Sequence, residues 1–157
     1  MDALEERVFA NGWRSATLDG DARGALRGLV TETGAPALSA YVMDSDLADV
    51  EALTPAGVSW HAYLHERTAI EYGAPPMEQP LDEVVRRALS WSAEAHLTSS
   101  ESAIGAAFDA QNVFVEDTLE KLLNALGITP APSGGSQEGQ PAAVPARIVD
   151  RRPEVTA

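Results

Sequence analysis

The fold is decided by residues 37–65, which read ALSAYVMDSDLADVEALTPAGVSWHAYLH. Apolar and polar side chains alternate along most of this stretch, and a period of two is typical of β-strands with one buried face. The alternation is interrupted at residues 44–46 and again at residues 54–57, where Asp, Ser, Pro and Gly provide turn chemistry. The pattern predicts a small sheet of three antiparallel strands.

The second turn also sets the register of its hairpin. Direct pairing of Leu53 with Val58 would place Glu51 opposite Trp60, so that an acid or a tryptophan would face the wrong side of the sheet. An offset of one residue removes this conflict. We therefore predict a G1 bulge at Gly57, because glycine readily adopts the left-handed conformation that this bulge requires.

Helical periodicity surrounds the predicted sheet. It indicates a helix near residues 20–33, a second over residues 80–96, and a long helical stretch that begins at the capping box of residues 98–101. Residues 112–115 could divide that last stretch into two helices, and residues 4–9 favour a further short helix. The order of elements predicts an α+β protein with its helices packed mainly on one face of the sheet.

The composition of the chain changes at residue 129. Residues 129–157 are rich in Pro, Gly and Ala, lack aromatic side chains, and offer too little apolar material to offset the entropy of ordering. We therefore predict a single acidic domain at residues 1–128 and a disordered tail at residues 129–157. Within the tail, residues 148–153 read IVDRRP, a short apolar and basic segment able to bind a partner by folding on contact.

The net charge of the protein indicates which kinds of molecule it can bind. The formal net charge is -13, and the folded domain carries all of it because acidic and basic residues balance in the tail. Such a field repels phosphate backbones and anionic lipid, which argues against nucleic acid and membrane partners and favours a basic protein. The chain has no cysteine and no apolar run long enough to span a membrane, so we expect a cytoplasmic protein.

Two histidines raise the question of metal chemistry. His61 and His65 are four residues apart, and Asp44 and Asp46 offer carboxylates in the first turn. On a β-strand, however, residues 61 and 65 lie about 13 Å apart at ~3.3 Å per residue, too far for two ligands of one ion. We assign no catalytic residue, metal or cofactor. A small metal-dependent enzyme that uses these four residues is kept as an alternative.

The face of the predicted sheet opposite the apolar one mixes aromatic and acidic side chains. If helices cover only the apolar face, this outer face is exposed, and such mixtures often mark recognition surfaces. We therefore expect a small protein-binding or regulatory protein without catalytic activity that acts through the outer face. A structural subunit of a larger complex is a second alternative. The candidate binding residues are Tyr41, Asp49, Glu51, His61 and Tyr63.

Overall fold

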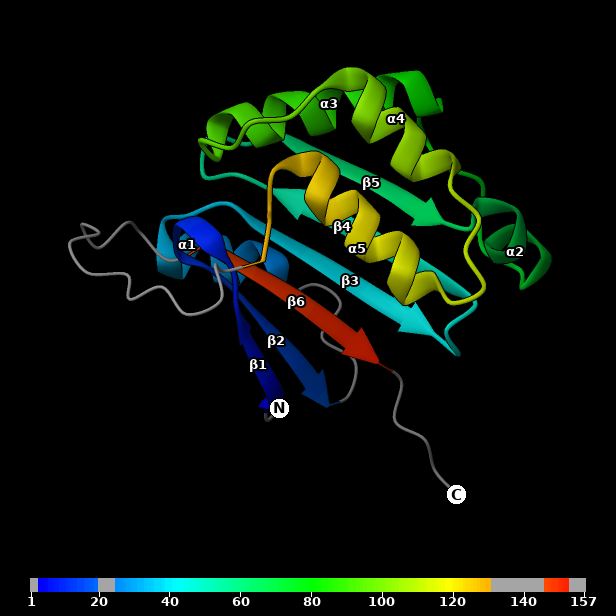
Figure 1. Cartoon of the computed structure of the whole chain (residues 1–157), viewed down its shortest axis with the longest axis horizontal. Coiled ribbons are helices and arrows are strands. Elements are labelled where there is room, and N and C mark those ends of the chain that lie inside the picture. Colours follow the sequence, from blue (N-terminus) through cyan, green and yellow to red (C-terminus); the bar gives the residue numbers. More distant parts are fainter. Residues whose placement is uncertain (1–2, 20–24, 131–145, 153–157) are drawn as a thin grey trace.

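The structure, a computed structural model, describes residues 3–19, 25–130 and 146–152 (Figure 1). Within these residues, a six-stranded sheet in the order β1-β2-β6-β3-β4-β5 forms the centre of the molecule. Its strands are β1 (Ala3–Val8), β2 (Trp13–Asp19), β3 (Ala37–Met43), β4 (Leu47–Leu53), β5 (Ser59–Leu64) and β6 (Ala146–Arg152). The helices are α1 (Leu26–Thr33), α2 (Glu66–Glu71), α3 (Leu81–Glu94), α4 (Glu101–Asp109) and α5 (Val115–Leu126), with a 3-10 turn η1 (Ala10–Gly12) before β2. The predicted α+β class is confirmed.

The predicted antiparallel strands are present as β3, β4 and β5. Gly57 has a φ of +96° in the turn between β4 and β5, and Glu51 pairs with His61 rather than with Trp60. The predicted offset at Gly57 is therefore confirmed. Its consequence is that Trp60 lies on the buried face of the sheet while the two polar residues share the other face.

The sheet extends beyond these three strands through the C-terminal segment. Ala146–Arg152 forms β6, which lies between β2 and β3 and runs parallel to both. Composition predicted disorder for residues 129–157, and the structure differs at these seven residues and at residues 129 and 130. The carbonyl of Thr129 accepts a hydrogen bond from the N–H of Ala10, and Pro130 forms a β-bridge with Phe9. Residues 131–145 and 153–157 lie outside the described residues. Local composition could not reveal β6, because its ladder hydrogen bonds go to strands near the start of the chain.

The N-terminal segment differs from the sequence prediction as well. The short helix expected over residues 4–9 is wrong, because Ala3–Val8 forms β1 and pairs antiparallel with β2. Three apolar residues in so short a run fit either a helical or a strand period. Pairing with a neighbouring strand decides between them.

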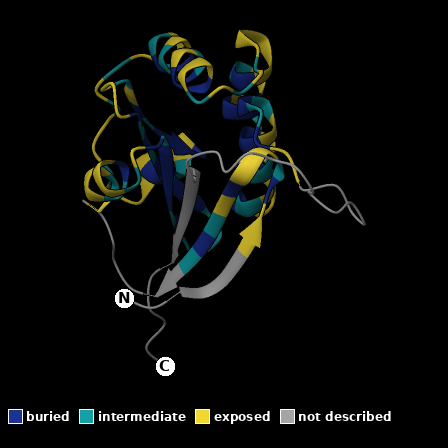
Figure 2. Cartoon of the chain, turned by 90° about the vertical axis from the view of Figure 1, so that its left-hand side faces the viewer, coloured by how far each residue is buried: buried dark blue, intermediate teal, exposed yellow. Residues whose placement is uncertain are grey.

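Helices α3, α4 and α5 cover one face of the sheet, and the core lies between these two layers (Figures 1 and 2). Trp60 of β5 and Trp91 of α3 are 3% and 0% exposed, so their predicted burial is confirmed. Their rings meet edge to face with centroids 6.4 Å apart, a preferred aromatic geometry. None of the described helices is long and apolar enough to cross a membrane.

Candidate functional site

The five candidate binding residues are brought together by strand register. Tyr41 pairs with Asp49, Asp49 pairs with Tyr63, and Glu51 pairs with His61. They share the face of the sheet opposite the core layer, because successive residues of a strand point to opposite sides. Four of them are half-buried, and Tyr63 is buried.

Tyr63 differs from its predicted role as an exposed binding residue. It is 7% exposed and belongs to a small apolar cluster with Leu47 and Ala69. Its hydroxyl donates a hydrogen bond to the carbonyl of Pro75 at 2.9 Å. The connection between α2 and α3 therefore folds over this end of the outer face, which strand periodicity alone could not indicate.

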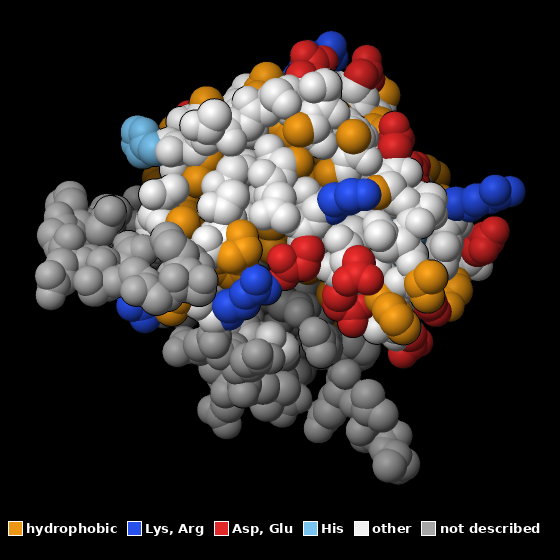
Figure 3. Space-filling view, viewed as in Figure 1, with side chains coloured by type: hydrophobic (Ala, Val, Ile, Leu, Met, Phe, Trp, Pro, Cys, Tyr) orange, Lys and Arg blue, Asp and Glu red, His pale blue; other side chains and the backbone are white. Residues whose placement is uncertain are grey.

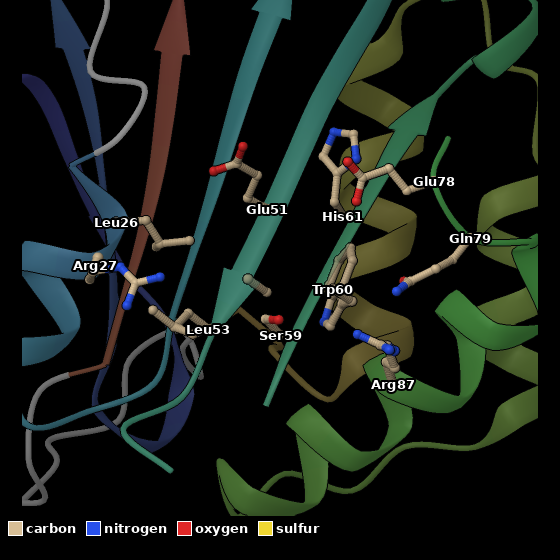
Figure 4. A pocket seen from close by; sticks show the side chains of 11 residues that line it. Leu26, Arg27, Glu51, Leu53, Ser59, Trp60, His61, Glu78, Gln79 and Arg87 are labelled. Carbon is tan, nitrogen blue, oxygen red and sulfur yellow. The ribbon is translucent and has the colours of Figure 1, made fainter. Parts of the chain in front are cut away.

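A pocket of about 360 Å³, here called the outer-face pocket, opens beside the remaining polar residues (Figure 4). Helix α1 forms one side, strands β4 and β5 form the floor, and the connection into α3 forms the other side. The lining residues are Leu26 and Arg27 on the first side, Glu51, Ala52, Leu53, Ser59, Trp60 and His61 on the floor, and Glu78, Gln79 and Arg87 on the other side.

Three carboxylates act on the imidazole of His61 on the floor of this pocket. His61 Nε2 lies 2.5 Å from Asp49 Oδ1. This hydrogen bond is the main cause that raises the pKa of His61 above 6.5; partial burial opposes it, and the negative charges of Asp49, Glu51 and Glu78 add to it. The ring of His61 also meets Tyr63 edge to face, with centroids 5.0 Å apart. Asp49 and Tyr63 therefore hold the imidazole in one orientation, and Glu51 and Glu78 act on it through their charge.

One of the two arginines that line the pocket is paired with a carboxylate outside the lining. Arg87 Nε lies 3.2 Å from Glu83 Oε1, and Arg86 lies 2.7 Å from the other oxygen of the same carboxylate. Hydrogen bonds from Arg86 and then Arg87 lower the pKa of Glu83, so this carboxylate stays ionised beside them. Arg27 lies across the pocket from Glu78 (Figure 4). The charged lining of the pocket thus consists of two glutamates near His61, one arginine on the opposite side and one arginine already paired with Glu83.

His65 does not join His61 in one site. Its ring is buried, with Nδ1 2.8 Å from the carbonyl oxygen of Asp46 and Nε2 2.8 Å from Thr118 Oγ1. His65 therefore connects the first turn of the sheet to α5, while Asp44 is exposed in that turn. Among the described residues, no group of three or more His, Asp or Glu could hold a metal ion. The four residues of the metal-enzyme alternative are not assembled into one site.

Sequence reasoning missed both sides of the outer-face pocket. Arg27 and Glu78 are far apart in the chain and carry no motif that would link them to the sheet. The one local signal is the run of prolines at residues 75, 76 and 80, which predicts an extended connection rather than a helix around Glu78.

No family model matches this chain, and no curated protein or solved structure is similar to it. The residues of the site are therefore the basis for any statement about function.

Proposed function

We propose that this protein binds a cationic segment of a partner protein in the outer-face pocket. One observation carries the proposal: His61, on the floor of a pocket of about 360 Å³, is hydrogen-bonded to Asp49, and the negative charges of Glu51 and Glu78 also act on its imidazole. Ligand pockets occupy roughly 300–1,000 Å³, so the space suits one long side chain better than a large cofactor. A Lys or Arg side chain could place its charge among the carboxylates.

Partial burial of Asp49 and Glu51 favours recognition, whereas Glu78 is exposed. The side chains of Asp49 and His61 are 28% and 37% exposed, so water screens their interactions less than it screens charges on an open surface. The overall charge of -13 would also steer a basic partner toward the molecule before contact. The side chains of the pocket then select among basic partners, which the overall electrostatic attraction does not distinguish.

A catalytic use of the same residues has less support. An Asp–His pair can act as a general base, but it needs a nucleophile or a bound water to activate. Ser59 carries an aliphatic hydroxyl on that face of β5, and no hydrogen bond joins it to His61 within the described structure. The hydroxyl of Tyr63 is already bonded to the carbonyl of Pro75. We therefore favour binding over catalysis.

The direct test compares two charge reversals of equal size. Acidic side chains are also exposed on the helix-covered face (Figure 3), so general attraction must be separated from binding in the pocket. Glu51→Lys changes the pocket, whereas Glu94→Lys makes the same change on the exposed end of α3. Fluorescence anisotropy with labelled hexa-arginine should show a loss of about tenfold or more for Glu51→Lys.

Glu94→Lys should retain binding within about twofold, since a remote exposed charge contributes only through the screened field. Both variants should melt near the parent protein, because surface substitutions usually change stability by less than about 0.5 kcal/mol. Equal losses in the two variants, or equal binding of hexa-glutamate, would contradict the proposal.

A further inference from the structure

Large hydrophobic side chains are exposed at one end of the molecule. Five such side chains are exposed among the described residues, and four of them belong to α2, to its C-cap or to the connection between α4 and α5. Single exposed hydrophobic residues are ordinary on a protein surface, whereas a group of them beside polar residues often marks an interaction site. The four are Ile70, Tyr72, Val113 and Phe114.

The turn between β3 and β4 brings two of these exposed segments together. The N–H of Val115 donates to the carbonyl of Ser45 at 2.8 Å. On the other side of the turn, the hydroxyl of Tyr72 donates to Asp46 Oδ2 at 2.6 Å. Since Ser45 and Asp46 are adjacent, the C-cap of α2 and the α4–α5 connection both contact one turn (Figure 1). We define the end patch as Tyr72, Val113 and Phe114.

Phe114 occupies a position that favours a different type of residue. It is the N-cap of α5, and its side chain cannot accept a hydrogen bond from the helix. N-cap positions favour Ser, Thr, Asp and Asn, whose side chains accept from the first N–H groups. Val113 precedes the cap, where a hydrophobic residue often packs against the first turn, yet it is 85% exposed. Residues that break local rules without a gain in packing are often functional.

Acidic side chains lie around Tyr72. The hydrogen bond with Asp46 is the main cause that raises the pKa of the Tyr72 hydroxyl, and the negative charges of Asp46, Asp44 and Glu71 add to it. Within residues 44–46, 66–72 and 110–117, Arg67 is the one basic residue. Its Nε lies 3.9 Å from Glu71 Oε1, so this charge is paired already.

The other side of the end patch is acidic as well. Glu116 and Asp117 form part of the first turn of α5, directly after Phe114. Glu116 Oε2 accepts a hydrogen bond from the hydroxyl of Ser45 at 2.8 Å, so this carboxylate lies beside the same turn. Figure 3 shows hydrophobic and acidic side chains next to one another at this end of the molecule.

We infer that the end patch docks a segment of a partner protein that combines large apolar side chains with Lys or Arg. The apolar side chains cover Phe114 and Tyr72, and the basic ones lie against the flanking acids. A second copy of the chain would bring the same acids face to face, and the net charge of -13 repels anionic lipid. The end patch shares no residue with the outer-face pocket, so this is a second contact surface.

A pair of variants tests the docking surface. Phe114→Ser removes the central aromatic side chain, and Val8→Ser is the matched control, because Val8 is 55% exposed on β1. Both are combined with Glu51→Lys, which changes the outer-face pocket. The probe is a labelled, capped peptide RLRWLR, and RSRSSR carries the same charge without large apolar side chains.

Fluorescence anisotropy should show RLRWLR bound about tenfold more weakly by the Phe114→Ser protein than by the Val8→Ser protein. The Val8→Ser protein should match Glu51→Lys alone within about twofold. RSRSSR should bind more weakly than RLRWLR and should not distinguish the two variants. Raised salt should weaken the binding of RLRWLR, because water and ions screen the exposed acids.

The melting temperature separates docking from a structural role of Phe114. Serine at the N-cap can accept a hydrogen bond from the first turn of α5, so Phe114→Ser should melt no more than a few degrees below Glu51→Lys alone. Weaker binding at unchanged or raised stability supports docking. A fall of about ten degrees or more would show that Phe114 is a packing residue and would overturn the inference.

Two further outcomes would overturn it. One is the absence of any difference in RLRWLR binding between Phe114→Ser and Val8→Ser, including no binding to either. The other is a dimer in sedimentation that Phe114→Ser dissociates, which would assign the end patch to a second copy. Because Glu51→Lys is present throughout, neither outcome contradicts cation binding in the outer-face pocket.

Discussion

His61 links the outer-face pocket to pH. Its hydrogen bond with Asp49 raises its pKa above 6.5 in the folded protein, so the folded state holds this proton more tightly than the unfolded chain does. The resulting stabilisation is fully present below the unfolded-state pKa, and it is lost as the pH rises through the higher folded-state pKa. The relevant window therefore starts near pH 6.5 and extends upward.

Asp49→Asn should lower the pKa of His61, because it removes both the anionic hydrogen-bond acceptor and the nearest charge. An NMR titration of the His61 ring protons measures the midpoint directly, and urea unfolding at about pH 6 and pH 8 measures the linked stability. The stability difference between these pH values should shrink in the variant. An unchanged midpoint would show that Asp49 does not control the imidazole.

At single residues, the sequence pattern predicted conformation and burial correctly wherever neighbouring residues in the chain determine them. Gly57 and Trp60 were predictable because turn chemistry and strand alternation act over a few neighbours. The burial of Tyr63 was not predictable, because it depends on the connection that contains Pro75, whose carbonyl accepts the hydrogen bond of the Tyr63 hydroxyl. An alternating pattern gives the face of a side chain and says nothing of which loop lies over it.

Among the elements, β6 has the largest effect on the architecture. β2 and β3 have no direct pairing with each other, and each is bonded to β6 instead. This strand therefore joins the β1–β2 hairpin to the three-stranded β3–β5 unit. Deleting a strand in this position leaves two rows of backbone groups without partners.

Replacement of residues 146–152 by an equally long Gly-Ser segment should destabilise the protein by at least about 2 kcal/mol, or roughly 5–10 °C in melting temperature. Circular dichroism during heating measures the change. Removal of residues 153–157, which follow β6, is the control and should leave the melting temperature within a few degrees. An unchanged melting temperature in the Gly-Ser variant would mean that β6 does not hold the two parts together.

The elements that sequence predicted correctly have strong local periods or clear caps. Helix α5 ends at Gly127 with a φ of +97°, as its sequence predicted. The capping box expected over residues 98–101 is shifted by two residues, because Ser100 is the N-cap of α4 and its side chain accepts a hydrogen bond from the N–H of Ala103 at 3.2 Å. β6 was missed because a strand with neighbours on both sides gains its stability from tertiary pairing rather than from composition.

At the scale of the whole molecule, the sequence predicts the net charge but does not predict the shape of the binding pocket. The charge of -13 is readable from the sequence, and it predicts the sign of a partner. The outer-face pocket is not readable, because α1, β5 and the connection before α3 come together only in the folded chain. Sequence could therefore place Glu51 and His61 on one face, while the opposing sides of the pocket required the structure.

The location of cation binding is the central claim, and two-dimensional NMR of the labelled protein during a hexa-arginine titration tests it most directly. Saturable shifts should concentrate on the amides of Glu51, His61 and Glu78 and on the side-chain signal of Arg27, because these residues line the pocket. Exposed acids on α3 and α5, including Glu94 and Asp117, should shift little. Shifts spread evenly over the acidic helices, with none at Glu51 or His61, would contradict the account.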